Sequence, residues 1–359
     1  MTGVPPTRIA QPKLEHFIRS VFVAAGLRDD LAADVAEVLI EADMMGHATH
    51  GVALVPMYLK SLESGGMAKD GEIEVLADMG ACATWTCHRL PGATVLKRAM
   101  DLAIERAKTF GCSTVSITDS YHMGALAVYL VQATQQGMMA VLSSSTLSSN
   151  GVAPFGGTVG VMTPNPIAAG IPTSGDPILL DISASITTRN KSLQYAAAGQ
   201  RFPGQWALDV DGNPSDDPNA LLDGGTLLPI GGLDHGHKGY ALGLMVEALT
   251  QGFSGIGRND EQTGTYTTGF LQVFDPRAFA GKDAFTRTTD HLVKLCQNNH
   301  PRAGVDKVRV PGENALARRR AALKNGVDLS GQIMQGLAAA AEQTGVKLPD
   351  PVVQRLCDI

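Results

Sequence analysis

Two histidines stand three positions apart at the start of the stretch HATHGVALVPMYLKSL, and the second is the residue best placed to do chemistry. His50 lies between Thr49 and Gly51, directly before a helix-like run. A hydroxyl could orient its ring there, and a glycine leaves room for a ligand. Imidazole titrates near neutral pH and can donate or accept a proton in catalysis. From spacing alone, His50 is either a proton donor or a polar residue of a turn.

Three further segments carry side chains suited to an anionic ligand. His122 in SYHMGAL follows an expected strand and opens an expected helix, where backbone N–H groups point toward an anion. Lys238 opens another expected helix between glycines, and Arg189 and Lys191 stand together in TTRNKS. Each of these side chains is as compatible with a helix cap or a solvated surface as with a binding role.

Several well-known catalytic patterns are missing from the chain. There is no GxGxxG between a strand and a helix, and the clusters PFGG and PIGG have neither that spacing nor its flanks. Walker A and HExxH patterns are also absent, which argues against P-loop phosphoryl transfer and zincin chemistry. The pairs His47/His50 and His235/His237 lack an accompanying carboxylate or cysteine cluster, so we expect no metal site.

The composition indicates a globular protein that acts on small molecules. The 359 residues are 44% hydrophobic and 18% charged, enough for a sizeable core and two or more domains. A net charge of −6 with no basic stripe argues against nucleic acid or a membrane as partner, and favours a small-molecule substrate. Five cysteines without a CxxC pair and no apolar leader segment favour a reducing, cytoplasmic location.

Hydrophobic periodicity predicts an α/β structure between two helical ends. Residues 12–64 contain three helical patterns, the second with an aspartate cap, which together predict a helical layer. Residues 93–110 carry apolar residues at the spacing of one helix face, and Gly111 supplies the end of that helix. Strand, helix and strand patterns then alternate as CSTVSITDS, GALAVYLVQATQQG and MMAVLSSST. This alternation predicts a sheet covered by helices.

The second half of the chain contains more turns. Residues 148–176 are rich in Gly, Pro, Ser and Thr and predict ordered turns. PILLDIS predicts a strand, TTRNKSLQYAAAG a helix and WALDVDGNPSDDPNALLDGG a polar loop. A basic stretch at 306–324 then precedes two amphipathic helices ending at PVVQRL, which we expect to fold back on the N-terminal helices.

Taken in order, these segments resemble the malate/L-lactate dehydrogenase family of the non-Rossmann type, which includes ureidoglycolate and sulfolactate dehydrogenases, diketogulonate reductase and piperideine-carboxylate reductase. ATHGVALVPMY resembles the family's SHGVxRLPxY, and SYHMGAL its SNHFGAA. TPNPIAAGIP resembles GTNPxAxxxP, and DISAS and RNK resemble DxATS and RGK. LLPIGG, HKGYALGLMVE and VRVPGE complete a set that spans nearly the whole chain.

The resemblance implies a mixed sheet that binds NAD or NADP without a Rossmann fingerprint. It implies a helical substrate and dimerisation domain built from residues 1–75 and 300–359, and an NAD(P)-binding α/β domain at 76–299. Two such chains would form an intertwined homodimer.

The resemblance also assigns roles to individual residues. His50 would donate or accept the proton, Thr49 would orient it in place of the family's serine, and Lys191 would be the third catalytic residue. His47, Leu54 and Tyr58 would contact the substrate. The cofactor-binding residues that it implies are His122, Met123, Gly124, Ala125, Leu126, Asp181, Ile182, Ser183, Arg189, Asn190, Lys238, Arg309, Pro311 and Gly312.

Some positions depart from the family pattern. Leu54 stands where the family places an arginine that grips the substrate carboxylate. Met45 replaces a common arginine, and Pro164 replaces a threonine. These changes imply a less acidic, larger or differently anchored substrate, or another anchor such as His47.

The resemblance therefore predicts an NAD(P)-dependent oxidoreductase that interconverts a 2-oxo acid, or related carbonyl compound, and its 2-hydroxy form. One alternative is a cyclic or N-alkyl imine reductase of the same fold, although such enzymes carry Asp in place of Lys191. Another, motivated by Leu54, is a cofactor-binding protein that has lost catalysis. Arg189 could meet the 2′-phosphate of NADP, but a solvated Arg189 fits NAD equally well.

Overall fold

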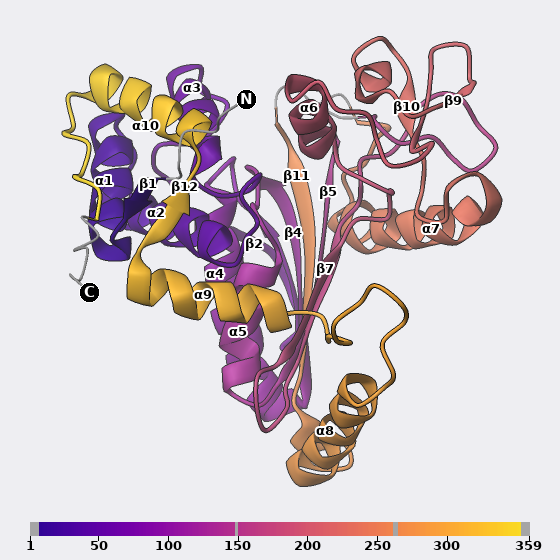
Figure 1. The fold of residues 1–359 in the computed structure, drawn as a ribbon. Coiled ribbons are helices and arrows are strands. Elements are labelled where there is room, and N and C mark those ends of the chain that lie inside the picture. The colour runs from indigo at the N-terminus through magenta and orange to yellow at the C-terminus, as the bar shows by residue number, and fades with distance from the viewer. Residues whose placement is uncertain (1–6, 148–149, 261–264, 353–359) are drawn as a thin grey trace, which may run out of the picture.

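A seven-stranded mixed sheet runs through the middle of the molecule (Figure 1). The computed structural model describes residues 7–147, 150–260 and 265–352. Only β3 and β4 are parallel neighbours in this sheet. In spatial order the strands are β2 (Glu74–Asp78), β3 (Cys82–Thr86), β4 (Cys112–Ser120), β11 (Thr267–Phe274), β5 (Met139–Thr146), β6 (Ile167–Ile171) and β7 (Ile178–Ile182). The predicted mixed α/β fold is confirmed.

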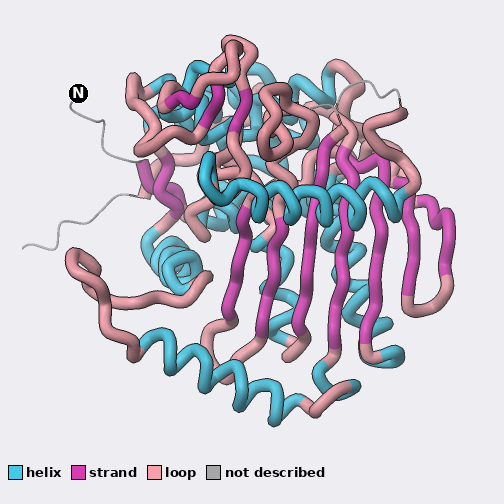
Figure 2. The backbone as a smooth tube through the Cα atoms, turned by 90° about the vertical axis from the view of Figure 1, so that its right-hand side faces the viewer, coloured by secondary structure: helices cyan, strands magenta, loops and turns pink. Residues whose placement is uncertain are grey.

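Helices cover the two faces of the sheet unequally. α4 (Gly92–Phe110) and α5 (Ala127–Gln135) pack on one face, and Gly111 ends α4 in a left-handed conformation at φ +80°, as predicted. The other face is crossed by α7 (Gly232–Glu247), which continues into a π-helical turn, Ala248–Gly252. α8 (Lys282–Gln297) lies near the opposite end of the strands, and Figure 2 shows no helix over the strands between α7 and α8.

Both ends of the chain form the helical layer beside the sheet. The N-terminal part contributes α1 (Gln11–Ala24), α2 (Asp29–Met44), η1 (Val52–Leu54) and α3 (Val55–Glu63). The C-terminal part contributes α9 (Glu313–Asn325) and α10 (Gly331–Thr344), which pack on α2 and α3. β1 (Thr7–Ile9) also pairs antiparallel with β12 (Val327–Leu329). The chain end therefore folds back as expected.

One hydrophobic core joins the helical layer to the sheet. Val35 and Leu39 of α2 belong to the same buried cluster as Leu96 of α4 and Leu142 of β5. The proposed division into domains at residues 75/76 and 299/300 stays a prediction.

A smaller lobe holds a second core above the end of the sheet. It contains α6 (Arg189–Ala197), η2 (Pro218–Leu221) and a three-stranded sheet of β8 (Ala207–Leu208), β9 (Pro214–Ser215) and β10 (Thr226–Leu227). Phe202 and Trp206 stack with ring centroids 5.3 Å apart and contact Tyr195 of α6. This packing holds α6, whose first turn carries Arg189 and Lys191, through Tyr195.

Two expected helix starts are wrong, and a contact distant in sequence sets one of them. α7 begins at Gly232, after Gly231 at φ +99°, so Lys238 lies one turn and a half inside the helix. α5 begins at Ala127, five residues after His122. The Ala127 N–H is capped by the Asp181 carboxylate of β7, at 2.9 Å, and that partner lies 54 residues away.

Two other expectations need correction, and the end of a third segment cannot be compared. β6 lies inside 148–176, where only turns were expected, because the sheet supplies neighbours on both sides of this short strand. The basic stretch forms α9 itself, since Arg319 and Arg320 pair with Glu41 and Asp176 and relieve the repulsion among its cations. The end of PVVQRL lies outside the described residues.

The expected aspartate cap of α2 is also wrong. Arg28 is the N-cap residue and makes no side-chain capping bond. Asp29 and Asp30 occupy the first turn instead, where negative charge favours the positive end of the helix dipole.

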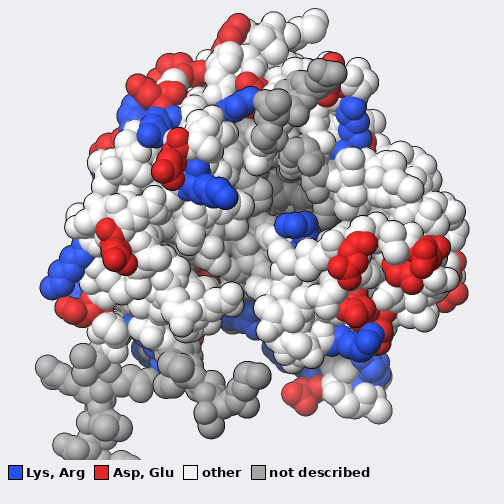
Figure 3. All heavy atoms as spheres, turned by 90° about the horizontal axis from the view of Figure 1, so that it is seen from above, with Lys and Arg blue, Asp and Glu red and all other residues white. Residues whose placement is uncertain are grey.

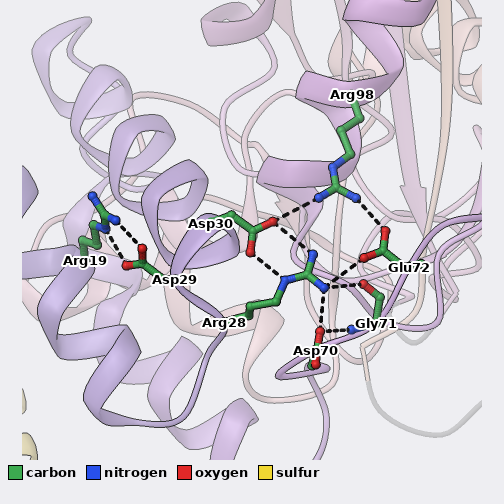
Figure 4. Close-up of polar contacts among 8 residues, drawn as sticks. All are labelled: Arg19, Arg28, Asp29, Asp30, Asp70, Gly71, Glu72 and Arg98. Carbon is green, nitrogen blue, oxygen red and sulfur yellow. Dashed lines mark hydrogen bonds and ion pairs between the residues drawn. The ribbon is translucent and has the colours of Figure 1, made fainter.

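Charged side chains tie the start of α2 to its surroundings (Figure 4). Arg28 pairs with Asp30, Asp70 and Glu72, and Arg98 of α4 pairs with Asp30 and Glu72. Single exposed ion pairs contribute little, but a network of shared partners holds its geometry better than isolated pairs. This network fastens the helical layer to α4, whose first residues support the candidate site.

Candidate active site

A cavity of about 470 Å³ opens between the helical layer and the smaller lobe. Figure 3 shows the molecule hollowed on this side, with basic side chains near the rim. A cavity of this size falls in the usual range for small-molecule sites. Its lining consists of residues 47, 49, 50, 122–126, 144–146, 163, 164, 166, 181–183 and 187–191. Most of the predicted site residues therefore come together in one place.

His50 stands in the wall of this cavity with its ring held on one side. The Thr49 hydroxyl lies 2.9 Å from Nδ1 of His50, at hydrogen-bond distance. This contact leaves Nε2 available for a ligand. Burial lowers the pKa of His50, the Asp181 carboxylate opposes that shift, and His47 adds to it. An imidazole in this setting releases a proton readily.

His122 faces His50 across the cavity floor. Their rings are nearly parallel, with centroids 5.8 Å apart and an interplanar angle of 17°. The Tyr58 hydroxyl lies 2.8 Å from Nδ1 of His122. Burial, together with His50, lowers the pKa of His122 to about 3, so this ring is neutral at physiological pH. Of the two histidines, His50 is the better proton donor.

Asp43 of α2 supports the loop that carries His50. Its carboxylate accepts the Val52 N–H at 2.7 Å. A Cβ at Gly51 would lie only 2.3 Å from this carboxyl group, so the absence of a side chain at Gly51 permits the contact. Burial raises the pKa of Asp43 to about 7. The loop is therefore held by a carboxyl group whose pKa is higher than usual.

Replacing Asp43 by Asn should change how stability depends on pH. Because the pKa of Asp43 rises from 3.8 to about 7 on folding, its contribution is fully present below pH 3.8 and is lost as the pH rises through 7. Asparagine can still accept the Val52 N–H but carries no titrating proton. We expect Asp43→Asn to gain about 2–4 °C in Tm relative to wild type between pH 5 and 8.

Thermal unfolding of both proteins across this pH range measures the difference. Asp101→Asn, a change of an exposed acid on α4, serves as the control. A constant Tm difference between Asp43→Asn and wild type over the whole range would contradict the role of Asp43.

Four backbone N–H groups beside His122 have no acceptor among the residues that the structure describes. Residues 123–126 line the cavity, and within the described parts of the chain nothing accepts their N–H groups. They lead into the N-terminus of α5, where a helix favours an anion. The segment therefore offers backbone donors to an anionic ligand, and the cofactor-binding role expected of residues 122–126 stays a prediction.

A second cavity of about 410 Å³ adjoins the first. His47, Asp181 and Ile182 line both cavities. Pro311 and Gly312 line only the second, where the Pro311 carbonyl accepts the Leu179 N–H at 3.1 Å. The two cavities are therefore neighbours that share part of their lining.

The remaining predicted residues lie apart from the first cavity. Leu54 is 7% exposed and belongs to the core of the helical layer, and Tyr58 is 3% exposed and contacts His122. Lys238 is exposed on α7, and Arg309 is exposed in the loop before Pro311. Their binding roles stay predictions. Among the described residues, no three His, Cys, Asp or Glu side chains gather as a metal site would require.

Sequence reasoning missed part of the cavity wall. Residues 144–146 form the polar end of β5, and Thr163 and Pro164 lie beside them. The run SSST at the carboxyl end of an expected strand was an available signal, because ligands of α/β proteins often lie there. Nothing in the local sequence distinguished Asp43 from the other acids of α2.

A buried polar network supports the part of the cavity wall formed by residues 144–146, Thr163 and Pro164. Asn165, in a left-handed conformation at φ +48°, donates to the Glu247 carboxylate at 2.8 Å and to the Gly243 carbonyl at 3.2 Å. Ser145 donates to Asn165 at 3.0 Å, and Arg258 pairs with Glu247 at 2.7 Å. The end of α7 therefore positions the cavity wall.

Comparison with known proteins agrees with this geometry. The sequence profile of the family described as malate/L-lactate dehydrogenase matches residues 9–338. The malate/(S)-sulfolactate dehydrogenase of Methanothermus fervidus is 31% identical, over 95% of this chain and 99% of that protein. The Delta(1)-pyrroline-2-carboxylate/Delta(1)-piperideine-2-carboxylate reductase of Pseudomonas syringae pv. tomato is also 31% identical, over 90% and 93%.

A solved structure shows the same fold. The malate dehydrogenase of Pyrococcus horikoshii superposes with a TM-score of 0.87 at 27% identity and covers 96% of this chain and 99% of its own. Within the described residues, no helix has both the length and the apolar character needed to cross a bilayer.

Proposed function

The chain belongs to the malate/L-lactate dehydrogenase family, and on this premise we propose that it is an NAD(P)-dependent oxidoreductase that interconverts a 2-oxo acid, or a related carbonyl compound, and its 2-hydroxy form. The observation that carries the proposal is the pair of nearly parallel rings of His50 and His122, beside four backbone N–H groups for which the described part of the chain provides no acceptor. A bound nicotinamide cofactor would supply or accept the hydride.

His50 performs the proton transfer in this proposal. Its Nε2 faces the substrate oxygen while Thr49 holds Nδ1 and so fixes the ring. The lowered pKa helps His50 release its proton to a developing alkoxide, and the Asp181 charge keeps the protonated form accessible. Residues 123–126 hold the cofactor phosphates through backbone N–H groups.

The basic side chains that would bind the substrate carboxylate line the first cavity. Arg189, Lys191 and His47 line the cavity that contains His50. Lys191 contacts Gln194 at 3.4 Å, its ammonium lies 5.5 Å from the centroid of the Tyr195 ring, and no carboxylate among the described residues pairs with it, so the ammonium is available to an anion. This arrangement provides an anchor even though Leu54 is apolar and buried.

Reduction of a cyclic imine is a second candidate. It is favoured by the likeness to the Pseudomonas syringae reductase, which acts on two cyclic imino acids according to its name. The same proton donor would serve, because a C=N group and a C=O group both gain a proton at the heteroatom. Lys191, which the resemblance associates with hydroxy-acid dehydrogenases, favours the carbonyl reaction.

Oxidation of NADH and NADPH in the presence of a substrate panel tests the proposal. The panel contains pyruvate, oxaloacetate, longer 2-oxo acids and two cyclic imino acids. We expect turnover with at least one 2-oxo acid. Turnover with imino acids alone would select the second candidate, and cofactor binding without any turnover would identify a protein that has lost catalysis.

We further propose that two copies of the chain form a homodimer. α8 has no buried residue, and its Leu292 and Leu295 are more than half exposed. α7 likewise presents Leu233, Leu244 and Met245 outward, and the strands between the two helices carry no helical cover (Figure 2). Apolar surface of this extent usually marks an interface. A molar mass in solution of twice 37.6 kDa, measured by light scattering, would support the dimer.

A further inference from the structure

A row of three arginines on α9 includes one that is without a carboxylate partner. Arg319 pairs with Glu41 at 2.7 Å, and Arg320 pairs with Asp176 at 2.9 Å. Arg318 pairs with no carboxylate among the residues that the structure describes. Its guanidinium lies instead on Gly46, where a Cβ would be 2.4 Å from Nη1 of Arg318. Gly46, at φ +89°, therefore allows the guanidinium to approach the loop that carries His47 and His50.

Arg318 stands at the edge of the second cavity. Apart from His47, it is the one basic side chain among the described residues that line this cavity. The one acid there, Asp181, is engaged by the Ala127 N–H at 2.9 Å. Arg318 also borders a third cavity, which Asp43 and Asp328 line, and Asp328 pairs with Arg8. The second cavity thus presents an unpaired cation to whatever occupies it.

The direction of the dinucleotide follows from the two cavities. With the nicotinamide beside His50 and His122, the unpaired N–H groups of 123–126 receive the diphosphate. The adenosine half then continues past Asp181 and Ile182, which line both cavities, into the second cavity. Arg189 lines the first cavity and not the second.

We propose that the second cavity holds the adenosine half of the cofactor and that Arg318 binds its 2′-phosphate, so that the protein prefers NADP to NAD. This inference rests on the proposed function and deepens it. A guanidinium suits a phosphate because it can donate two parallel hydrogen bonds. The free guanidinium on α9, rather than Arg189, then decides the choice of nucleotide.

Binding measurements on the intact protein test the inference without recourse to activity. Titration calorimetry with NADP, NAD and adenosine 2′,5′-bisphosphate gives the dissociation constants. For wild type we expect NADP to bind at least about tenfold more tightly than NAD, the value of one charge-assisted phosphate contact. Arg318→Ala should weaken NADP and adenosine 2′,5′-bisphosphate by about 10- to 30-fold and leave NAD within about threefold.

Two matched variants separate this role from general charge effects. Arg320→Ala removes a paired arginine from the same helix and should leave the NADP preference unchanged. Arg189→Ala should leave it unchanged as well. Loss of the preference in Arg189→Ala but not in Arg318→Ala, or a wild-type protein that binds NAD as tightly as NADP, would overturn the inference while the proposed function stands. Failure to bind either dinucleotide would contradict the proposed function itself and the inference with it.

Discussion

His50→Ala is expected to lower turnover by about 10²-fold or more while the dissociation constant of the cofactor stays nearly unchanged. The reason is geometric. Thr49 lies 2.9 Å from Nδ1 of His50 and leaves Nε2 available, whereas the N–H groups of residues 123–126, which we propose as phosphate donors, lie in a separate segment. Removing the imidazole deletes the proposed proton donor and leaves the proposed phosphate donors in place. Steady-state kinetics combined with a cofactor titration measures both quantities.

A second variant sharpens this test. His16→Ala changes an exposed histidine of α1, far in sequence from the cavity loop, and should leave turnover at the wild-type value. A near-normal rate in His50→Ala would remove His50 from the mechanism. An equal loss of turnover and of cofactor affinity would mean that His50 binds the cofactor rather than transferring the proton.

The sequence predicted the elements whose apolar residues follow one period. α4 has its buried residues on one face and a glycine that adopts φ +80° at its end, and both features can be read locally. β4 and β5 were also predicted from their own residues. Their partner β11 was not, because it enters the sheet between them from more than 100 residues later in the chain. Periodicity describes an element but says nothing of which distant strand lies beside it.

The same distinction applies to the site. His50 and Thr49 are neighbours in sequence, so their contact could be anticipated from the motif. The contact between Asp43 and the Val52 N–H depends on how α2 packs beside η1. The free guanidinium of Arg318 depends on which carboxylates reach its two neighbours on α9. Such features arise from tertiary packing, and a single sequence carries no local signal for them.

Gly92→Ala is expected to lower kcat/KM, because the new side chain would displace the loop that carries His122. A Cβ at this first residue of α4 would lie 2.5 Å from the His122 carbonyl oxygen and 2.7 Å from the Met123 Cα. Both contacts are with backbone, so the loop must move as a whole, and overpacking of this kind costs about 1–3 kcal/mol. A displacement near 1 Å of a catalytic segment can lower the rate by about 10²-fold. We expect kcat/KM to fall by about that factor.

Gly175→Ala is the matched control, because its nearest neighbour outside the adjoining residues would be the Thr173 hydroxyl at 4.0 Å. It should leave both Tm and kcat/KM near wild type. For Gly92→Ala, a fall in Tm with unchanged kcat/KM at a temperature well below Tm would show that the loop relaxes without disturbing His122. A loss of kcat/KM in a protein that stays folded would instead tie the start of α4 to the placement of His122. In that case Gly92→Ala should also bind NADP more weakly than wild type does, because the N–H groups of residues 123–126 belong to the same loop.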